Sequence, residues 1–118
     1  MRLRIATSKP LSEPDDDEDL LLAALRVRGV DARMAAWNDP RELWDEPIPT
    51  VIRSTWDYVQ HFAAFDAWLG RAAAAAPLWN PLEIVRANLH KRYLLELEAR
   101  GIAIVDTELV ERGARTTL

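Results

Sequence analysis

Polar side chains that could bind a small ligand directly follow two short apolar segments of the chain. Residues 3–7 end in Thr7, which is followed by Ser8 and Lys9. Residues 50–54 lead into a denser set of guanidinium, hydroxyl, carboxylate and aromatic groups: Arg53, Ser54, Thr55, Trp56, Asp57 and Tyr58. A few convergent polar groups beside aromatic rings are typical of pockets for small polar molecules such as amino acids. We therefore predict that both segments contribute to a substrate-binding site.

The second set also has a purely structural interpretation. Trp56 and Tyr58 could fill space in the core, because large aromatic side chains are mostly buried. Asp57 could cap the element that follows it, since aspartate is a preferred helix N-cap. Residue types and spacing favour neither interpretation over the other.

Lysine is scarce in this chain, and one lysine stands where an anion would be stabilising. Of 15 basic residues, Lys9 and Lys91 are the only lysines. If Asn88 caps the helix that follows, Lys91 lies in its first turn, close to the positive end of the helix dipole. A lysine is unfavourable at that end unless an anion lies nearby, and a bound phosphate would be such an anion. A lysine that extends into water explains the same residues and is the favoured interpretation from the residues alone.

Other kinds of chemistry have less support. The absence of cysteine excludes thiol nucleophiles, disulfides and cysteine-based zinc sites. Walker A and G-x-G-x-x-G motifs are missing, and His61 and His90 lack the spacing of a metal site. The acidic run 15–19 could hold a cation, but a solvated helix N-terminus explains it better, because Arg26 and Arg28 stand at the other end.

Length and charge restrict the class of protein further. The chain has 118 residues, 49% of them hydrophobic, which is enough for one packed domain. Its net charge of −4 argues against non-specific binding to nucleic acid or anionic membranes. The apolar stretch 20–25 is too short to span a bilayer, and it follows acidic residues rather than the basic start of a signal peptide. We expect a cytoplasmic protein.

The elements that position these side chains alternate between strands and helices. Strands are predicted at 3–7, 30–37, 50–54, 78–79 and 102–105. Helices are predicted at about 15–28, ended by Gly29, at 62–76, and at 89–100, ended by Gly101, with a helical turn from Pro81 through Asn88. This alternation predicts an α/β fold with a mostly parallel sheet. Ligands of such sheets bind at the carboxyl ends of the strands, where the strand order reverses, and both polar segments lie at strand ends.

Several blocks of residues resemble a known family. Trp79-Asn80-Pro81, then the stretch 88–94 with its His-Lys-Arg-Tyr core, then Gly101-Ile102 and Thr107, resemble the entry into the ATP-grasp domain of glutathione-synthetase-like ligases. The stretch 53–58 resembles the strand-end motif of one bacterial subgroup of that family. This subgroup includes the cyclo-ligase of cycloserine biosynthesis, which acts on O-ureido-D-serine. The resemblance extends from Arg2 to about Thr107.

The resemblance implies an architecture and a set of roles. Residues 1–80 would form the pre-ATP-grasp domain, a small Rossmann-like parallel sheet with flanking helices. Residues 81–118 would hold the first helix and strand of a truncated ATP-grasp domain. Lys91 would be the first of two lysines that contact nucleotide phosphates, and the loops 7–9 and 54–58 would face the acceptor substrate. Such ligases use ATP and Mg²⁺ to convert a carboxylate into an acyl phosphate, which an amine or a similar nucleophile then attacks.

This sequence also departs from the pattern of the family. His90 occupies the place of the usual Asp or Asn before the lysine, and Ala103 and Asp106 replace prolines that commonly flank the next strand. The second lysine, the adenine-reading strand and the late Mg²⁺ ligands of a complete ligase do not occur in these 118 residues. We therefore expect this chain alone to be inactive and not to bind ATP and Mg²⁺ tightly.

Truncation of a ligase at this point would also expose apolar surface. Leu94, Leu97 and Ile102 would lack the sheet that covers them in a complete ATP-grasp domain. Because exposed apolar patches favour association, we expect this surface to promote contact between copies of the chain.

Two other interpretations remain open. A non-catalytic, truncated α/β module that binds a small ligand or a partner chain has the same composition and elements. An unrelated flavodoxin-like or receiver-like domain is the third. A receiver would carry paired acids at the end of the first strand, where Thr7, Ser8 and Lys9 stand instead.

Overall fold

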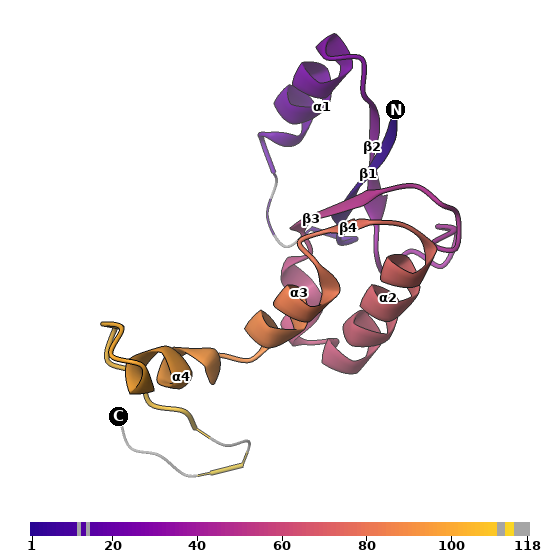
Figure 1. Cartoon of the computed structure of the whole chain (residues 1–118). Helices are drawn as coiled ribbons and strands as arrows, with labels where there is room; N and C mark the ends of the chain where they lie inside the picture. Colours follow the sequence, from indigo (N-terminus) through magenta and orange to yellow (C-terminus); the bar gives the residue numbers. More distant parts are fainter. Residues whose placement is uncertain (12, 14, 111–112, 115–118) are drawn as a thin grey trace. The chain divides into compact units, whose positions relative to one another are not determined.

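The computed structural model of this chain describes residues 1–11, 13, 15–110 and 113–114. The chain forms two compact units, 1–82 and 83–118 (Figure 1). The predicted domain boundary lies between residues 80 and 81. The last part of the predicted second domain, residues 111–112 and 115–118, lies outside the described residues. Its assignment to an ATP-grasp domain stays a prediction.

The first unit is built on a four-stranded parallel sheet. Its strands are β1 (Arg2–Thr7), β2 (Asp31–Ala36), β3 (Thr50–Ser54) and β4 (Leu78–Trp79). Their spatial order is β2-β1-β3-β4, and all three neighbouring pairs are parallel. The chain runs outward from β1 to β2 and then returns to the other side of β1, so the strand order reverses between β1 and β3. The predicted α/β fold with a parallel sheet is confirmed.

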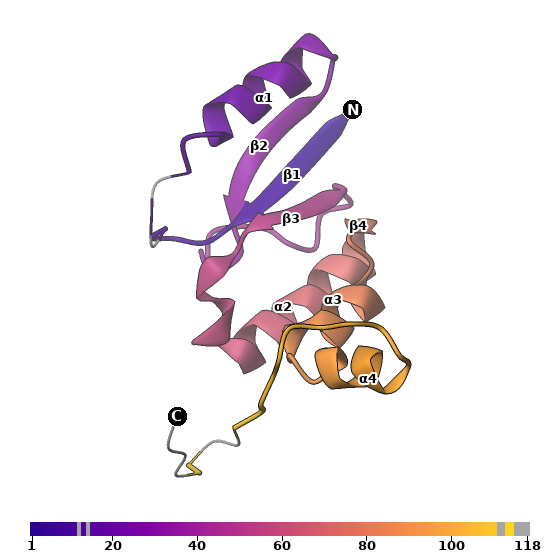
Figure 2. The ribbon, with the colours of Figure 1, turned by 90° about the vertical axis from the view of Figure 1, so that its left-hand side faces the viewer.

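Helices lie on both sides of this sheet. α1 (Glu18–Val27) connects β1 to β2, and α2 (Phe62–Ala75) connects β3 to β4 after a short 3-10 helix, η1 (Trp56–Val59). Figure 2 shows α1 and α2 on opposite sides of the strands. Right-handed crossovers require this arrangement, because the two connections run in opposite directions across the sheet.

The core lies between the sheet and α2. Phe65, Trp68, Leu69 and Ala72 are buried, and their i, i+3, i+4, i+7 spacing places them on one face of the helix. Trp44 meets Trp68 edge-to-face at 4.9 Å between ring centroids, which is a favourable geometry for aromatic pairs. By contrast, no residue of α1 is fully buried. The aromatic face of α2 therefore contributes most of the apolar burial from the helices.

A buried cation also lies in this core. Arg4 is almost fully buried on β1, and its guanidinium carbon lies 5.0 Å from the centroid of the Trp44 ring. Its Nη2 donates to the backbone oxygen of Glu46 at 3.1 Å and lies 3.5 Å from the Glu46 carboxylate. Because a buried charge without a partner is costly, these contacts hold the irregular segment around Trp44 against the sheet.

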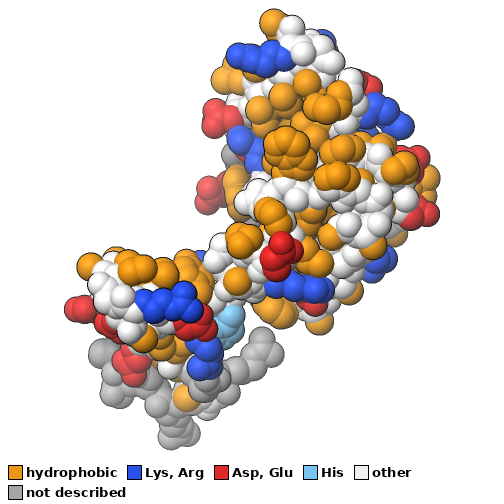
Figure 3. Space-filling view, in the orientation of Figure 1, with side chains coloured by type: hydrophobic (Ala, Val, Ile, Leu, Met, Phe, Trp, Pro, Cys, Tyr) orange, Lys and Arg blue, Asp and Glu red, His pale blue; other side chains and the backbone are white. Residues whose placement is uncertain are grey.

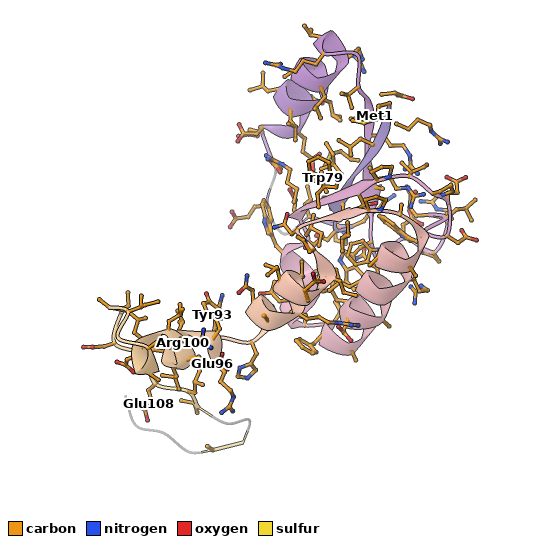
Figure 4. All side chains as sticks on the ribbon, in the orientation of Figure 1. Met1, Trp79, Tyr93, Glu96, Arg100 and Glu108 are labelled. Atoms are coloured by element: carbon orange, nitrogen blue, oxygen red, sulfur yellow. The ribbon has the colours of Figure 1, made fainter. Side chains whose placement is uncertain are left out.

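The side of the sheet opposite α2 carries exposed apolar side chains. Trp79 on β4 is 61% exposed (Figure 4), and hydrophobic side chains gather over the strands on this side of the first unit (Figure 3). None of the helices that the structure describes is both long and apolar enough to cross a membrane.

The second unit corrects the predicted helix at 89–100. Two helices are present, α3 (Leu82–Leu89) and α4 (Tyr93–Ala99), so Asn88 lies inside α3 instead of capping the next helix. The turn between them is fixed by His90, whose ring Nδ1 accepts a hydrogen bond from the backbone N–H of Arg92 at 3.1 Å. This local bond replaces a helical one, and Lys91 consequently lies in the turn and not in a first helical turn.

Glycine ends α1 and α4 as predicted. Gly29 and Gly101 have positive φ angles of 75° and 79°. After α4, the N–H of Gly101 bonds the carbonyl of Glu98, and the N–H of Ile102 bonds that of Leu97, which is a Schellman motif. The predicted strand 102–105 is wrong. Its first N–H is used by this cap, and no described strand pairs with it.

The α2 face provides a matched test of this core. Phe65 is 2% exposed and Phe62, in the same helix, is 48% exposed. We expect Phe65→Ala to lower the free energy of unfolding by about 3–5 kcal/mol, because it leaves a cavity among aromatic rings. Phe62→Ala should lower it by about 1 kcal/mol or less, since the site is at the surface. Urea denaturation of both variants checks this, and equal losses would contradict the assigned core.

Candidate functional site

The structure brings the two predicted polar segments together at the carboxyl ends of β1 and β3. One backbone oxygen, that of Ser54, accepts three hydrogen bonds from the end of β1 and the residue after it. They come from the N–H of Ser8 at 3.0 Å, its hydroxyl at 3.1 Å and the Thr7 hydroxyl at 3.4 Å. A register irregularity between Ala6 and Thr7 accompanies this convergence. Thr7, Ser8, Ser54 and Thr55 are all buried, so the backbone of both strand ends is fixed.

Asp57 links the ends of three strands. Its Oδ1 accepts a hydrogen bond from the Trp37 indole N–H at 2.8 Å, and its Oδ2 accepts one from the Asn38 amide at 3.0 Å. The same amide group of Asn38 also donates to the backbone oxygen of Lys9 at 2.8 Å and accepts from its N–H at 2.9 Å. Both carboxylate oxygens of Asp57 are therefore engaged within the protein.

The two aromatic residues of the second segment differ in their surroundings. Tyr58 packs on Phe65 with ring centroids 5.4 Å apart, so it fills space at the edge of the core. Trp56 opens η1 and is exposed. The core-filling interpretation thus describes Tyr58 and not Trp56. Contact of either residue with a substrate stays a prediction.

Arg53 connects this site to the loop before α1. Its Nη2 lies 3.0 Å from Oδ1 of Asp15, and its Nε donates to Oδ2 at 3.2 Å. The hydroxyl of Ser54 donates to the same carboxylate at 2.5 Å. The Asp15 side chain is only 9% exposed. These hydrogen bonds, that of Arg53 first, lower the pKa of the Asp15 carboxyl.

This ion pair corrects the interpretation of residues 15–19 as a solvated helix start. α1 begins at Glu18, so Asp19 and Glu18 lie in its first turn and Asp17 is its N-cap. Asp15 stands outside the helix and bonds β3 instead. A long-range contact of this kind leaves no periodic signal in the sequence, which is why the acidic run alone does not indicate it.

Within the part of the chain that the structure describes, two hollows lie near the carboxyl ends of the strands. The smaller one has a volume of about 380 Å³ and is lined by side chains that follow β1 and β2 together with the start of α1. Its lining residues are Thr7, Ser8, Lys9, Leu11, Glu18, Met34, Ala36, Asp39 and Glu42. The larger one, of about 760 Å³, lies between residues 37–45 and α2. None of the predicted site residues lines the larger hollow, so the smaller one is the candidate site.

The contribution of β2 to this site was not predicted from the sequence. Trp37 and Asn38 follow β2 directly, and Asp39 lines the smaller hollow. The strand-end rule that selects residues 7–9 and 53–58 applies equally to β2, because its carboxyl end lies beside that of β1. The turn signal Asn38-Asp39-Pro40 marks the end of that strand in the sequence. The strand-end rule, applied to β2 as well, therefore selects Asn38 and Asp39.

Lys91 belongs to the second unit and is exposed in the turn between α3 and α4. Its Nζ lies 5.7 Å from the centroid of the Tyr93 ring, which is within cation–π distance. The predicted place of Lys91 in a first helical turn is wrong, because Lys91 precedes Arg92, the N-cap of α4. Its proposed contact with a phosphate therefore depends on the family resemblance and not on helix electrostatics.

The fold and the strand ends define a Rossmann-like α/β domain with a polar cavity near the reversal of strand order. The family model for the N-terminal domain of D-cycloserine synthetase DcsG matches residues 3–80. This chain belongs to that family of N-terminal domains.

Two further comparisons support the same assignment. The cycloserine biosynthesis protein DcsG of Streptomyces lavendulae is 34% identical over 109 residues, which cover 92% of this chain and 36% of that protein. The crystal structure of D-cycloserine synthetase DcsG matches with a TM-score of 0.85 and 32% identity, over 97% of this chain and 38% of the other. These matches confirm the predicted resemblance to the cyclo-ligase of cycloserine biosynthesis. The chain spans little more than a third of the length of the matched DcsG chains.

The Asp15–Arg53 pair predicts a pH-dependent contribution to stability. The pKa of Asp15 is below its ordinary value of 3.8, so the carboxylate stabilises the folded state above that pH. We expect Asp15→Asn to lower the free energy of unfolding at pH 7. The difference from the unaltered protein should shrink as the pH falls below 3.8 through the lowered pKa, because the native carboxyl is then protonated as well.

Urea denaturation at a series of pH values measures this difference. Asp16→Asn is the matched control, because Asp16 is exposed next to Asp15 in the chain. The control should differ little from the unaltered protein at pH 7. If the loss of unfolding free energy in Asp15→Asn is the same at pH 7 and at acidic pH, the ion pair is not its cause.

Proposed function

We propose that this chain is the N-terminal part of an ATP-dependent ligase of the ATP-grasp type, cytoplasmic, and acting on an amino-acid-like substrate. The observation that carries the proposal is the match to D-cycloserine synthetase, with a TM-score of 0.85 over 97% of the chain. The meeting of the β1 and β3 ends at Ser54 supports it, because open parallel sheets bind ligands at such points.

The reaction that we propose for the complete protein has two steps. ATP, with its phosphates neutralised by Mg²⁺, supplies the phosphoryl group that activates the substrate carboxylate. A carboxylate oxygen attacks the γ-phosphorus, ADP leaves, and an acyl phosphate forms. A nucleophilic nitrogen then attacks the acyl carbon and the C–O bond to phosphate breaks, so inorganic phosphate is released.

The residues of this chain would bind and orient the substrate. In our proposal the loops 7–9 and 54–58 face the acceptor, with backbone positions fixed by the bonds to Ser54 and Asp57. Arg53 also belongs to the substrate-binding set in our proposal, and its guanidinium is held by Asp15. Lys91 would contact nucleotide phosphates, and its exposed ammonium in a turn is compatible with that role.

Lys91 tests the nucleotide part of the proposal in the complete protein. We expect Lys91→Ala to raise the Kd for ATP by about tenfold or more, because a charge-assisted bond to phosphate is lost. Lys9→Ala is the matched control, because it removes the other lysine of this chain, which lies in the proposed substrate-binding loop 7–9. Calorimetric titration with Mg²⁺–ATP measures both. Unchanged ATP affinity in Lys91→Ala would contradict the role of Lys91.

The isolated chain tests whether its nucleotide site is incomplete. We expect titration of the 118-residue chain with Mg²⁺–ATP to show no tight binding, because a second lysine and late carboxylate ligands are missing. Sub-micromolar affinity would contradict this.

The alternative function, a non-catalytic module that binds a small ligand, predicts a different result with ATP. A complete protein that binds an amino acid but neither binds nor hydrolyses ATP would support the non-catalytic module instead.

Self-association through Leu94, Leu97 and Ile102 also remains a proposal, and sedimentation of the chain at several concentrations tests it.

A further inference from the structure

The smaller hollow of the first unit has the size and polarity of a ligand site. Its volume of about 380 Å³ lies within the range of about 300–1,000 Å³ common for small-molecule pockets. Hydroxyl groups of Thr7 and Ser8 line it beside one lysine and three carboxylates. It is formed by β1, β2 and α1, whereas residues 53–58 do not line it.

Two of the three carboxylates are already neutralised by arginine. Asp39 accepts two bonds from the Arg41 guanidinium, at 2.7 Å and 3.0 Å. Glu42 accepts two from Arg33, at 2.7 Å and 2.8 Å. Bidentate pairs of this kind leave little charge for a further partner. Asp39 and Glu42 therefore act as walls of the hollow rather than as binding groups.

Glu18 is the third carboxylate, and it lacks such a partner. Its Oε1 is buried and makes no hydrogen bond within the part of the chain that the structure describes. Among the same residues, no lysine or arginine forms an ion pair with it. Burial, and next the charge of Asp15, raises the pKa of the Glu18 carboxyl, although Arg53 and the Thr7 hydroxyl partly offset this. A cation in the hollow would relieve the remaining cost.

Lys9 supplies a charge of the opposite sign at the same hollow. Its side chain is 65% exposed, and its Nζ lies 3.8 Å from an oxygen of Asp39. Arg41 holds that same oxygen at the shorter distance of 2.7 Å. The ammonium group of Lys9 is thus held only loosely and can turn toward an anion. Its backbone is fixed by Asn38, so the side chain starts from a defined place.

We propose that this hollow binds the zwitterionic head of an α-amino acid. The Glu18 carboxylate receives the ammonium group of the ligand, with the Thr7 and Ser8 hydroxyls beside it, and Lys9 receives the carboxylate group. This inference rests on the proposed function and deepens it by assigning one protein group to each charge of the amino-acid substrate. It adds Glu18 and the β2 side of the sheet to the site, which the family resemblance did not indicate.

Calorimetry on the complete protein without nucleotide tests the proposal with three probes. Serine carries both charges, glycerate replaces the ammonium group with a hydroxyl, and ethanolamine lacks the carboxylate. We expect serine to bind and each of the other two to bind at least about tenfold more weakly, since each loses one charge-assisted contact. Both enantiomers of serine are titrated, and binding of either supports the proposal.

Variants identify the groups responsible. Glu18→Gln keeps the size of the side chain but should weaken serine binding about tenfold or more while leaving the weak binding of glycerate unchanged. Lys9→Ala should produce the converse pattern, with serine weakened and ethanolamine unchanged. Asp19→Asn is the matched control: it is the next residue of α1, is exposed and does not line the hollow, so serine binding should stay as in the unaltered protein.

Three results would overturn the proposal: no saturable serine binding, equal binding of serine and glycerate, or an unchanged serine affinity in Glu18→Gln. These results are separate from those for the proposed function. If ATP binding depends on Lys91 and the serine experiment fails, the ligase holds its substrate elsewhere. If serine binds through Glu18 and ATP does not bind, the amino-acid site is real and the ligase assignment is wrong.

Discussion

The first unit depends on how β1 is held between β2 and β3 at their carboxyl ends. Parallel strands have no hairpin to fix their register, so side chains must do it. On one side of β1 the Ser54 carbonyl gathers the bonds of Thr7 and Ser8. On the other side Asn38 ties the backbone of Lys9 to Asp57. Several of these groups also belong to the candidate site, so the contacts that fix the sheet also shape its cavity.

Local signals in the sequence predicted most of the elements correctly. The four strands within residues 1–80, the helix at 62–76 and the helix ends at Gly29 and Gly101 all depend on residues within a few positions of each other. The errors arose where the outcome depends on partners. Residues 102–105 have β-propensity but no described strand to pair with, and His90 breaks a helix through one side-chain bond to Arg92.

The candidate site was predictable in its location and only partly in its composition. The strand-end rule correctly brought residues 7–9 and 53–58 to one edge, because that rule follows from topology. It could not show that Asp57 accepts hydrogen bonds from Trp37 and Asn38, or that Asp15 pairs with Arg53 on β3. Such contacts join residues that are far apart in the chain and carry no spacing pattern. The sequence does not single out Glu18 for the same reason. Its importance depends on the lack of an arginine or lysine partner among the described residues, which only the structure shows.

The placement of the aromatic residues has a consequence for optical measurements on this protein. All five tryptophans lie in residues 1–82, and three of them, Trp37, Trp44 and Trp68, are in ring contact within the core. The second unit holds no tryptophan and one tyrosine, Tyr93. Tryptophan emission therefore reports on the first unit alone. A fluorescence transition can be complete while α3 and α4 keep their structure, so the two units can be followed separately by comparing emission with far-ultraviolet dichroism.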